Sequence, residues 1–496
     1  MSAFFSWQAL CAAAQARARE LGESVVASAV LRAPPAEGGA GGEPAEPVAL
    51  LERVNGGDAG QFRFAWERPK DRFALAGGGA ALQIVAEGER RFQELGERVD
   101  SALRHAVTGY EDEREGERVA QGSPLAPLAV GGFSFFDRLD PEQWPGFGAA
   151  QMVIPRWLAW RSGSRGQTVV SAAVNPDSDL AIVAGEMQTL GAALRHGDPS
   201  HPAPRAHHNG SSGGSAGERG NGPRPADDVE GHRRWLEMVR FALARIRSGT
   251  LSKVVLARAV EVLGTLPAPL RAFRALRAAY PDCFTFWFDP GQGQGFLGAT
   301  PERLARLAGG TVHLGAMAGT APRGDRPDAD EMHGARLLAS EKQREEHDIV
   351  VQAILDAVRP LGGALEFPET PRLVKLTNVQ HLYTPITVTP PEPMSLIALL
   401  GRLHPTPAVG GHPRPEALAL IRDQEGFDRG WYAGPVGWID ARGDGEFAVA
   451  LRSGTLRAGR ARLFSGAGIV ADSDPEMEYF ETQMKLPPML NALLHE

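Results

Sequence analysis

Cysteine is almost absent from this chain of 496 residues, which contains only Cys11 and Cys283. Two cysteines cannot build a disulfide framework, so the composition excludes a disulfide-stapled secreted fold and favours a reducing compartment. The sequence also lacks any run of about 18 apolar residues, so no transmembrane helix is expected. Its Ala-rich start has no basic segment ahead of an apolar one, unlike a secretory signal. We therefore expect a cytoplasmic protein that does not bind a membrane.

An excess of basic residues is lacking too. The chain has 52 Lys and Arg against 60 Asp and Glu, a net charge of −8, and no basic stripe. This balance argues against a nucleic-acid-binding protein. Lysine itself is scarce, because only five of the basic residues are lysines. In an arginine-rich background a lysine suits a role that arginine cannot fill, such as losing a proton. We rank Lys253 and Lys485 first on this ground.

Composition divides the chain into three parts. Residues 1–196 are rich in short β-like runs, and residues 229–496 mix helical and strand-like patterns. Between them, residues 197–228 are rich in Gly, Ser, Pro and Arg and bury too little surface to repay their ordering entropy, which predicts a flexible insertion. Strands follow one another across Gly-rich turns without strict βαβ alternation, which predicts an α+β fold with large antiparallel sheets. Long helices are expected over 329–360 and 474–492.

The last predicted helix carries an acidic and basic face. Glu478, Glu481 and Lys485 are spaced i, i+3 and i+7, so their side chains project from one side of the helix. Pro475 suits the first turn of that helix. The spacing is compatible with a cavity lining and also with a solvated face that holds an ion pair.

A second acidic element lies in SEKQREEHDIVVQAIL, where Glu346 is in register with the apolar Ile349 and Val350. A carboxylate at the edge of a buried face is unfavourable unless it is paired or binds a metal. A Mg²⁺ site needs one or two protein carboxylates, with water and substrate oxygens completing the coordination. Glu346 and Glu481 would supply them. Because 135 residues separate them, spacing alone does not show that they meet.

Lys253 begins an apolar strand-like run, with Val255 and Ala257 on its side. Desolvation there lowers a lysine pKa toward the range of a general base, although a strand-end lysine that reaches out to solvent fits the pattern equally well. Glu302 follows another such run, a suitable place for a carboxylic acid that stays protonated.

Arg452 stands among apolar neighbours in FAVALRSG, inside an expected strand, and suits a bidentate grip on a carboxylate. The glycine-containing segments GTAPRG (319–324) and SGAGIV (465–470) offer backbone N–H groups to an anion, yet neither fits a P-loop or a dinucleotide fingerprint. Together these features predict a small, multiply anionic substrate and a Mg²⁺ ion.

The motifs, in their order along the chain, resemble those of the chorismate-utilising enzymes. The resemblance covers about residues 231–493, whereas the N-terminal part agrees only loosely. It rests on KVVLAR (253–258), FLGATPERL (296–304), AGTAPRG (318–324), SEKQREEHDIVVQ (340–352), NVQHLYTPI (378–386), HPTPAVGGHP (404–413), DRGWYAGPVGW (428–438), FAVALRSG (447–454) and SGAGIVADSDPEMEYFETQMK (465–485).

The resemblance implies the fold of anthranilate synthase component I, in which two large antiparallel sheets with outer helices enclose the active site. It implies chorismate as the substrate and Mg²⁺ as the cofactor, held by Glu346 and Glu481, with Glu478 contributing directly or through water. The positions similar to the family's substrate contacts are Gly319, Thr320, His381, Ala408, Tyr432, Arg452, Gly466, Ala467, Gly468 and Lys485.

Within the family the chain looks most like the isochorismate synthases. Lys253 matches the lysine that activates water in that branch, Glu302 matches the acid that protonates the departing hydroxyl, and Ala408 stands where aminating and lyase members usually carry threonine. The resemblance therefore implies attack of water at C2 and loss of the C4 hydroxyl, in a pathway to menaquinone or to a catecholate siderophore. It implies no glutaminase subunit, and we expect a monomer.

Three alternatives stay open. A salicylate synthase would also eliminate pyruvate. An anthranilate or aminodeoxychorismate synthase component I would use ammonia, and aminodeoxychorismate synthase also has a lysine at the position of Lys253. The third is a non-catalytic paralogue that binds chorismate or a protein partner.

Overall fold

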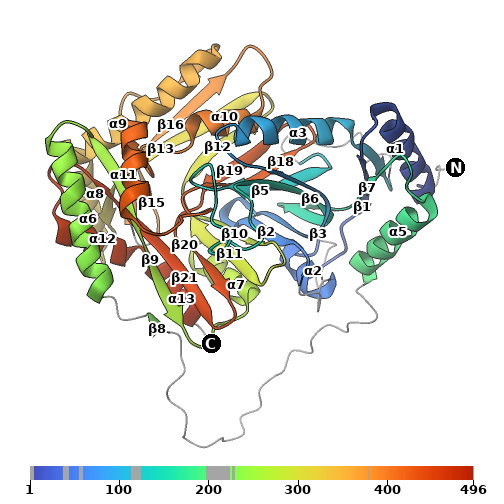
Figure 1. Cartoon of the computed structure of the whole chain (residues 1–496), viewed down its shortest axis with the longest axis horizontal. Helices are drawn as coiled ribbons and strands as arrows, with labels where there is room; N and C mark the ends of the chain where they lie inside the picture. The colour runs from blue at the N-terminus through green and yellow to red at the C-terminus, as the bar shows by residue number, and fades with distance from the viewer. Residues whose placement is uncertain are drawn as a thin grey trace, which may run out of the picture.

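A continuous, mostly antiparallel sheet organises the computed structural model, which describes residues 5–36, 44–54, 60–112, 124–196, 224–225, 229–377 and 379–494 (Figure 1). The predicted insertion over 197–228 lies outside the described residues except for the short strand β8 (Arg224–Pro225), which pairs with β9. Among the described helices, none is long and apolar enough to cross a membrane.

Two long strands form the middle of this sheet: β3 (Phe73–Ala86) and β6 (Ala150–Ser162) pair along their whole lengths. One arm leaves β3 and runs through β2 (Arg63–Arg68), β10 (Phe284–Asp289), β11 (Gln294–Thr300), β20 (Ser453–Arg457) and β21 (Arg460–Ile469) to β9 (Lys253–Leu263). The other arm leaves β6 and runs through β5 (Leu128–Phe133), β18 (Pro435–Asp440), β19 (Gly445–Val449), β12 (Arg303–Ala308) and β13 (Thr311–Pro322) to β16 (Val379–Thr389). The two predicted antiparallel sheets are these two arms, and the α+β prediction is confirmed.

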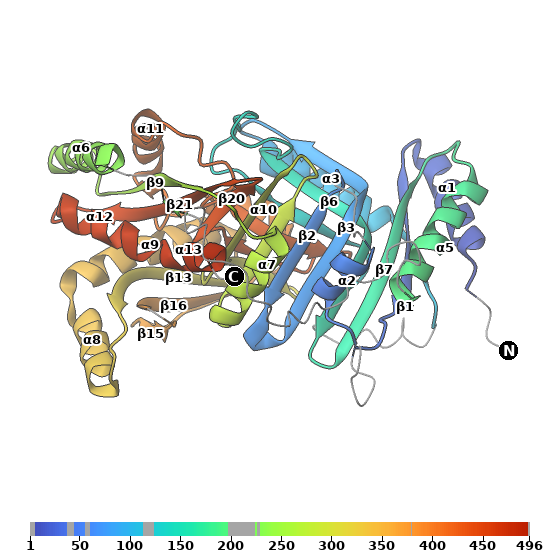
Figure 2. The ribbon, with the colours of Figure 1, turned by 90° about the horizontal axis from the view of Figure 1, so that it is seen from below.

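The far half of β6 also pairs with β7 (Arg165–Val174), which pairs with β1 (Val25–Arg32). Helices α1 (Trp7–Leu21) and α5 (Leu180–His196) cover this N-terminal extension, as Figure 2 shows at its right-hand end. The pairing of β1 with β4 (Val107–Tyr110) is parallel.

Helices cover the outer faces of the arms. On the β9–β21 side these are α6 (Val229–Arg247), α11 (Arg414–Gln424) and α12 (Pro475–Met484), and α9 (Glu341–Val358) packs on β13 (Figure 2). The remaining elements are α2 (Pro47–Val54), η1 (Pro69–Asp71), α3 (Arg91–His105), α7 (Pro269–Ala279), α8 (Pro327–Ala339), η2 (Arg359–Leu361), β14 (Ala364–Glu366), β15 (Arg372–Lys375), α10 (Leu396–Leu403), β17 (Gly411–His412) and α13 (Pro487–Leu494).

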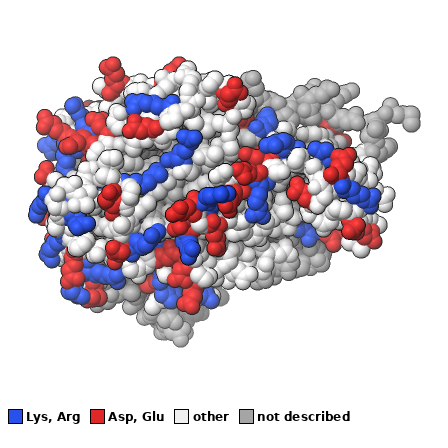
Figure 3. All heavy atoms as spheres, turned by 45° about the horizontal axis from the view of Figure 1, so that its top comes forward, with Lys and Arg blue, Asp and Glu red and all other residues white. Residues whose placement is uncertain are grey.

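The central strands are apolar on both faces, because each face meets a different core. In β10, Phe284, Phe286 and Phe288 belong to the larger apolar cluster, whereas Trp287 belongs to a second cluster on the other face. Successive side chains of a strand point to opposite faces, so burial of both faces produces a continuous apolar run rather than an alternating one. On the face drawn in Figure 3, acidic and basic side chains intermingle and no field of one sign covers it.

Two predicted helices are each divided in two, which corrects the sequence interpretation. The helix expected over 329–360 is α8 followed by α9, because Ser340 has an extended backbone and its hydroxyl accepts a hydrogen bond from the Gln343 N–H. The helix expected over 474–492 is α12 followed by α13. A new helix begins at Pro487, since proline lacks the N–H that a continuing helix requires.

Candidate active site

One pocket collects the predicted site residues from both arms of the sheet. Strands β9 and β21 form one wall, β13 and β16 form another, and α9 and α12 contribute side chains from the outside. Every residue predicted for the site lines this pocket except Ala467. The juxtaposition of Glu346 on α9 with Glu478 and Glu481 on α12, which the sequence spacing left open, is therefore present.

Lys253 is the first residue of β9 and is only 3% exposed. Burial lowers its pKa, against the opposing effect of the Glu346 and Glu481 carboxylates. Gly468 faces it from β21: a Cβ at that glycine would lie 3.3 Å from Lys253 Cε. The lysine is thus a desolvated amine, and the alternative of a strand-end lysine that reaches solvent is excluded.

Glu302 lies between β11 and β12 and is 8% exposed. Burial raises the pKa of its carboxyl to about 7, although the charges of Lys253, Lys485 and Arg452 oppose the shift. At neutral pH Glu302 is therefore protonated in a large fraction of the molecules. The pocket therefore holds a base with a lowered pKa and an acid with a raised one, which is the arrangement expected of paired acid–base catalysts.

Three carboxylates gather at the α9–α12 side. Burial raises the pKa of Glu478 to about 7 and raises that of Glu346, and the charge of Glu481 adds to both shifts. Burial also disfavours the ionised form of Glu481, but Lys485 Nζ lies 2.7 Å from its Oε1 and the net pKa is below the usual value. The predicted common face of Glu478, Glu481 and Lys485 is a cavity lining that also contains the ion pair.

The strand β13 contains a bulge at Gly319, whose φ of +77° favours glycine. The bulge directs the Gly319 carbonyl and the Thr320 hydroxyl to His381 Nδ1, at 3.2 and 3.1 Å. Burial lowers the His381 pKa to about 3, so the ring is neutral. A carbonyl only accepts hydrogen bonds, so the proton sits on Nδ1 and Nε2 is left as an acceptor.

Arg452 does not lie inside a strand, which corrects the sequence prediction. It occupies the turn between β19 and β20 with a φ of +47°, an uncommon backbone conformation for a residue other than glycine. Its Nη1 is buried and makes no hydrogen bond with the described residues. Tyr432 lies on the same pocket, 4% exposed, and burial raises its pKa. The guanidinium is available to a ligand.

Three residues of the SGAGIV segment, Ser465, Gly466 and Gly468, line the pocket. The N–H groups of Val255 and Ala257, which lie opposite Gly468 and Gly466, donate to groups outside β21. The cross-strand pairs Val255–Gly468 and Ala257–Gly466 are therefore non-hydrogen-bonded pairs, and the two glycines direct their N–H groups away from β9. Lys485 Nζ donates to Gly466 O at 2.8 Å on that side.

Ala467 is the exception among the predicted residues. It pairs with Leu256 across the ladder, and its side chain is buried in the larger core cluster. The period of two along a strand places it on the opposite face from its two glycine neighbours. The Ala467 side chain therefore does not line the pocket, and the expected substrate contact of the backbone around Gly466, Ala467 and Gly468 stays a prediction.

Sequence reasoning missed several pocket residues, among them the polar Lys342, Gln343 and Arg429. Lys342 and Gln343 lie one turn before Glu346 on α9, so helical spacing contained the signal for both. Arg429 is 1% exposed and donates to Val409 O and Val255 O at 2.9 and 2.7 Å. It fixes the segment next to Ala408 against the strand of Lys253, a tertiary relation without a local sequence signal.

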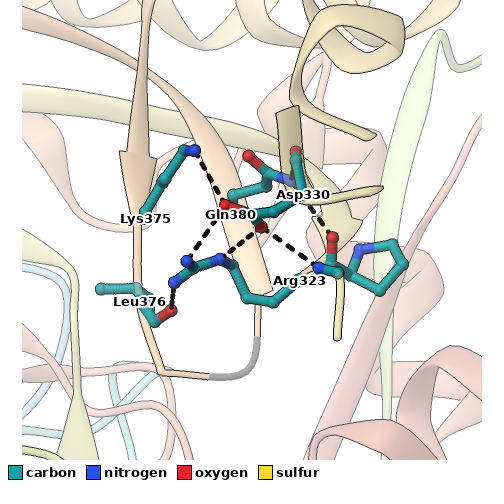
Figure 4. A network of polar contacts seen from close by, with 7 residues as sticks. Arg323, Asp330, Lys375, Leu376 and Gln380 are labelled. Atoms are coloured by element: carbon teal, nitrogen blue, oxygen red, sulfur yellow. Dashed lines mark hydrogen bonds and ion pairs between the residues drawn. The ribbon is translucent and has the colours of Figure 1, made fainter. Parts of the chain in front are cut away.

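A polar network outside the pocket holds the bulged strand (Figure 4). Arg323, from the GTAPRG segment, donates to Asp330 Oδ1 and Oδ2 at 2.6 and 3.1 Å, and Lys375 donates to Oδ2 at 2.8 Å. Gln380 Nε2 donates to Pro322 O and Asp330 O. The network ties the first turn of α8 to β13, β15 and β16.

We expect Asp330→Asn to lower the melting temperature at neutral pH, and we expect the wild-type advantage to narrow as the pH falls below about 4. The Arg323 and Lys375 hydrogen bonds hold the Asp330 pKa well below its usual range. A depressed folded-state pKa adds stability above the unfolded-state pKa, about 3.9, and that stability is lost as the pH falls through the folded-state value. Calorimetric melting of both proteins from pH 7 to pH 3 tests this, and a gap independent of pH would contradict it.

Comparison with known proteins gives a consistent result. Residues 40–494 match the family model described as chorismate binding enzyme. The chain is 39% identical over 431 residues to the salicylate biosynthesis isochorismate synthase of Pseudomonas aeruginosa, covering 86% of this chain and 84% of that protein. It is 35% identical over 441 residues to the isochorismate synthase MenF of Bacillus subtilis, covering 87% and 88%.

A solved structure agrees in fold. The menaquinone-specific isochorismate synthase MenF of Escherichia coli superposes with a TM-score of 0.72 at 23% identity, covering 98% of this chain and 99% of that one.

Proposed function

The chain belongs to the chorismate-binding enzyme family, and from its active site we propose that it is an isochorismate synthase, an isomerase that converts chorismate to isochorismate. The observation that supports this most directly is the pair formed by Lys253 and Glu302. Burial shifts the two pKa values in opposite directions within one pocket, which prepares a base and an acid for a reaction that needs both.

The chemistry follows from these two side chains. Neutral Lys253 accepts a proton from water as the water oxygen forms a bond to ring carbon C2. The ring double bonds shift, the C4–O bond breaks, and protonated Glu302 donates its proton to the departing hydroxyl, which leaves as water. One water is consumed and one is released, so no redox cofactor is required. A proton then passes from Lys253 back to Glu302 through solvent, and the starting protonation states return.

The residues fit a Mg²⁺ ion held partly by the protein. Among the described residues no three Asp, Glu, His or Cys side chains are close enough to form a complete metal site. Mg²⁺ is usually bound by one or two carboxylates, with water and substrate oxygens completing the shell. Glu346 and Glu481 would hold it, with Glu478 directly or through water. Bound there, the ion would neutralise the ring carboxylate of chorismate.

The charges of the pocket support a dianionic substrate with a divalent cation. Lys253 is taken as neutral, Glu302 as protonated and Arg429 as paired to Glu425. Glu346 and Glu478 are taken as ionised, because a cation bound beside them would lower their raised pKa values, and the other charged lining groups then balance. Adding Mg²⁺ then gives +2, which matches the two carboxylates of chorismate. The balancing groups are the cations of Lys342, Arg452 and Lys485 and the anions of Glu346, Glu478 and Glu481.

Purified protein incubated with chorismate and Mg²⁺ is expected to give a product of unchanged mass, identified by chromatography with mass detection. EDTA should abolish its formation and added Mg²⁺ should restore it, because the carboxylates of the pocket then lose and regain their cation. Matched reactions with and without ammonium separate the alternatives. Salicylate with pyruvate would assign a salicylate synthase, and ammonium-dependent aminated product would assign a component I enzyme. The absence of any reaction would favour a non-catalytic paralogue.

A further inference from the structure

Gln343 lines the catalytic pocket from α9, one helical turn before Glu346. The two side chains are spaced i, i+3 and therefore project from the same face of the helix, with about 4.5 Å of rise between their Cα atoms. Gln343 thus stands beside a carboxylate that we assign to the metal site, and the mechanism described above gives it no role.

The orientation of the Gln343 amide is fixed by its partner. Its Oε1 accepts a hydrogen bond from the Thr320 N–H at 3.0 Å. A backbone N–H is only a donor, so the amide cannot be flipped at this position. The Nε2 group, with two N–H donors, is consequently the other end of the same planar amide.

The bulge of β13 explains this fixed orientation. Gly319 lies against the same amide, since a Cβ at Gly319 would be 3.1 Å from Gln343 Oε1. Thr320, which donates to the amide, also reaches His381 Nδ1 through its hydroxyl. The bulge therefore positions the Gln343 amide on one side and the His381 ring on the other, before any ligand binds.

We propose that Gln343 is a substrate-binding residue whose Nε2 donates a hydrogen bond to a carboxylate of the bound dianion. This inference rests on the proposed function, because it requires a carboxylate substrate in this pocket. An amide N–H is a neutral donor, so it contributes to a carboxylate acceptor without disturbing the balance of charge in the pocket. Its oriented Oε1 means that the donor is prepared in advance, which lowers the entropy lost on binding.

The substitution Gln343→Glu tests the proposed hydrogen bond from Nε2 to the substrate separately from the hydrogen bond between Oε1 and the Thr320 N–H. A glutamate retains an oxygen that accepts from the Thr320 N–H, but it has no N–H to donate and places a negative charge toward the substrate. Gln343→Met removes both the acceptor and the donor at similar length. We expect Gln343→Glu to weaken substrate binding with little change in melting temperature, whereas Gln343→Met lowers the melting temperature as well.

Binding is measured by calorimetry with chorismate and Mg²⁺ in a Lys253→Ala background, in which turnover does not consume the ligand. Gln343→Glu should raise the chorismate Kd by roughly 10- to 100-fold, the range for a hydrogen bond to a charged group. In the otherwise wild-type enzyme the same change should appear mainly in KM. The control is Gln352→Glu, which adds the same charge at an exposed position on α9 and should leave Kd within twofold.

A Gln343→Glu protein that binds chorismate as tightly as its parent would overturn this inference and leave the proposed function intact. Failure of the parent itself to bind chorismate, with no turnover by the wild type, would overturn both. An equal loss of affinity in the Gln352→Glu control would also refute the contact, because the effect would then be one of net charge on the helix.

Discussion

Lys253→Ala is expected to lower kcat/KM for chorismate by roughly 10²- to 10⁴-fold, the usual contribution of a positioned general base. The removed amine is almost fully buried, and burial keeps its pKa below that of an ordinary lysine. Water alone would then have to attack C2 with no group in place to accept its proton. Steady-state assays of isochorismate formation measure the loss.

The fold should survive this substitution. Removing the amine deletes a desolvated basic group, and no hydrogen bond from its Nζ holds another element of the described structure in place. The melting temperature should therefore stay near that of the wild type. Small primary amines added to the variant should restore part of the activity, because they can occupy the space left beside Gly468.

Lys70→Ala is the matched control, since Lys70 forms an ion pair with Asp282 at the surface and neither residue lines the pocket. It should be fully active. Normal activity in Lys253→Ala would refute the assignment of the base, and a collapse of the melting temperature would show that the lysine supports structure instead.

Sequence patterns predicted β9, β10 and β11, because a strand buried on both faces is a long apolar run that is recognised without knowledge of its partners. They did not predict β12 and β13. The apolar run that begins at Lys253 is β9, and the apolar segment CFTFWF (283–288), which the same pattern marks as a strand, contains most of β10. Helix ends were less accessible. The apolar residues keep their helical spacing across Ser340 and across Pro487, so the sequence pattern does not show that one helix ends and another begins there.

The site residues that could be predicted from the sequence are those whose side chains are ionisable. A buried lysine and several carboxylates are informative on their own, since each is unfavourable in a core without a function. Ala467 faces the core while Gly466 and Gly468 line the pocket, a separation that the alternation of strand side chains already indicates. Gln343 was overlooked although its spacing from Glu346 places it on the pocket face.

The role of Arg429 could not be predicted from any local sequence pattern. Its partners, Val255 O, Val409 O and Glu425, come from separate segments, and only the folded arrangement brings the first two together. The ion pair between Glu425 and Arg429 supports the outer edge of β9. Glu425 Oε1 accepts a hydrogen bond from the Ala257 N–H at 2.7 Å, and Arg429 donates one to the Val255 carbonyl. A buried ion pair here takes the place of a neighbouring strand.

Glu425→Gln is expected to destabilise the protein by about 3–5 kcal/mol, because it leaves the Arg429 guanidinium as an uncompensated charge in the interior. The side chains of Glu425 and Arg429 are only 2% and 1% exposed. The glutamine still offers an oxygen to the Ala257 N–H, so the loss reports mainly on the missing charge. Urea unfolding followed by circular dichroism, with the calorimetric melting temperature, measures it.

Glu237→Gln provides the matched control. Glu237 pairs with Arg233 across the same i, i+4 spacing, but both side chains are more than half exposed. Exposed pairs contribute about 0–1 kcal/mol, since solvent screens them. The same chemical change at the same i, i+4 sequence spacing should therefore differ several-fold in its effect. A loss below about 1 kcal/mol for Glu425→Gln would contradict the assignment of a stabilising buried pair.

The double variant Glu425→Leu/Arg429→Met decides what the pair does for the active site. Apolar replacement of both partners of a buried pair is often neutral or stabilising. Here the backbone groups of Val255, Ala257 and Val409 would also lose their partners, each at about 1–3 kcal/mol. We therefore expect the double variant to remain destabilised and, when assayed below its melting temperature, to lose activity, because Lys253 and Ala408 are then no longer held against each other. A stable, fully active double variant would show that packing alone fixes the strand of the catalytic lysine.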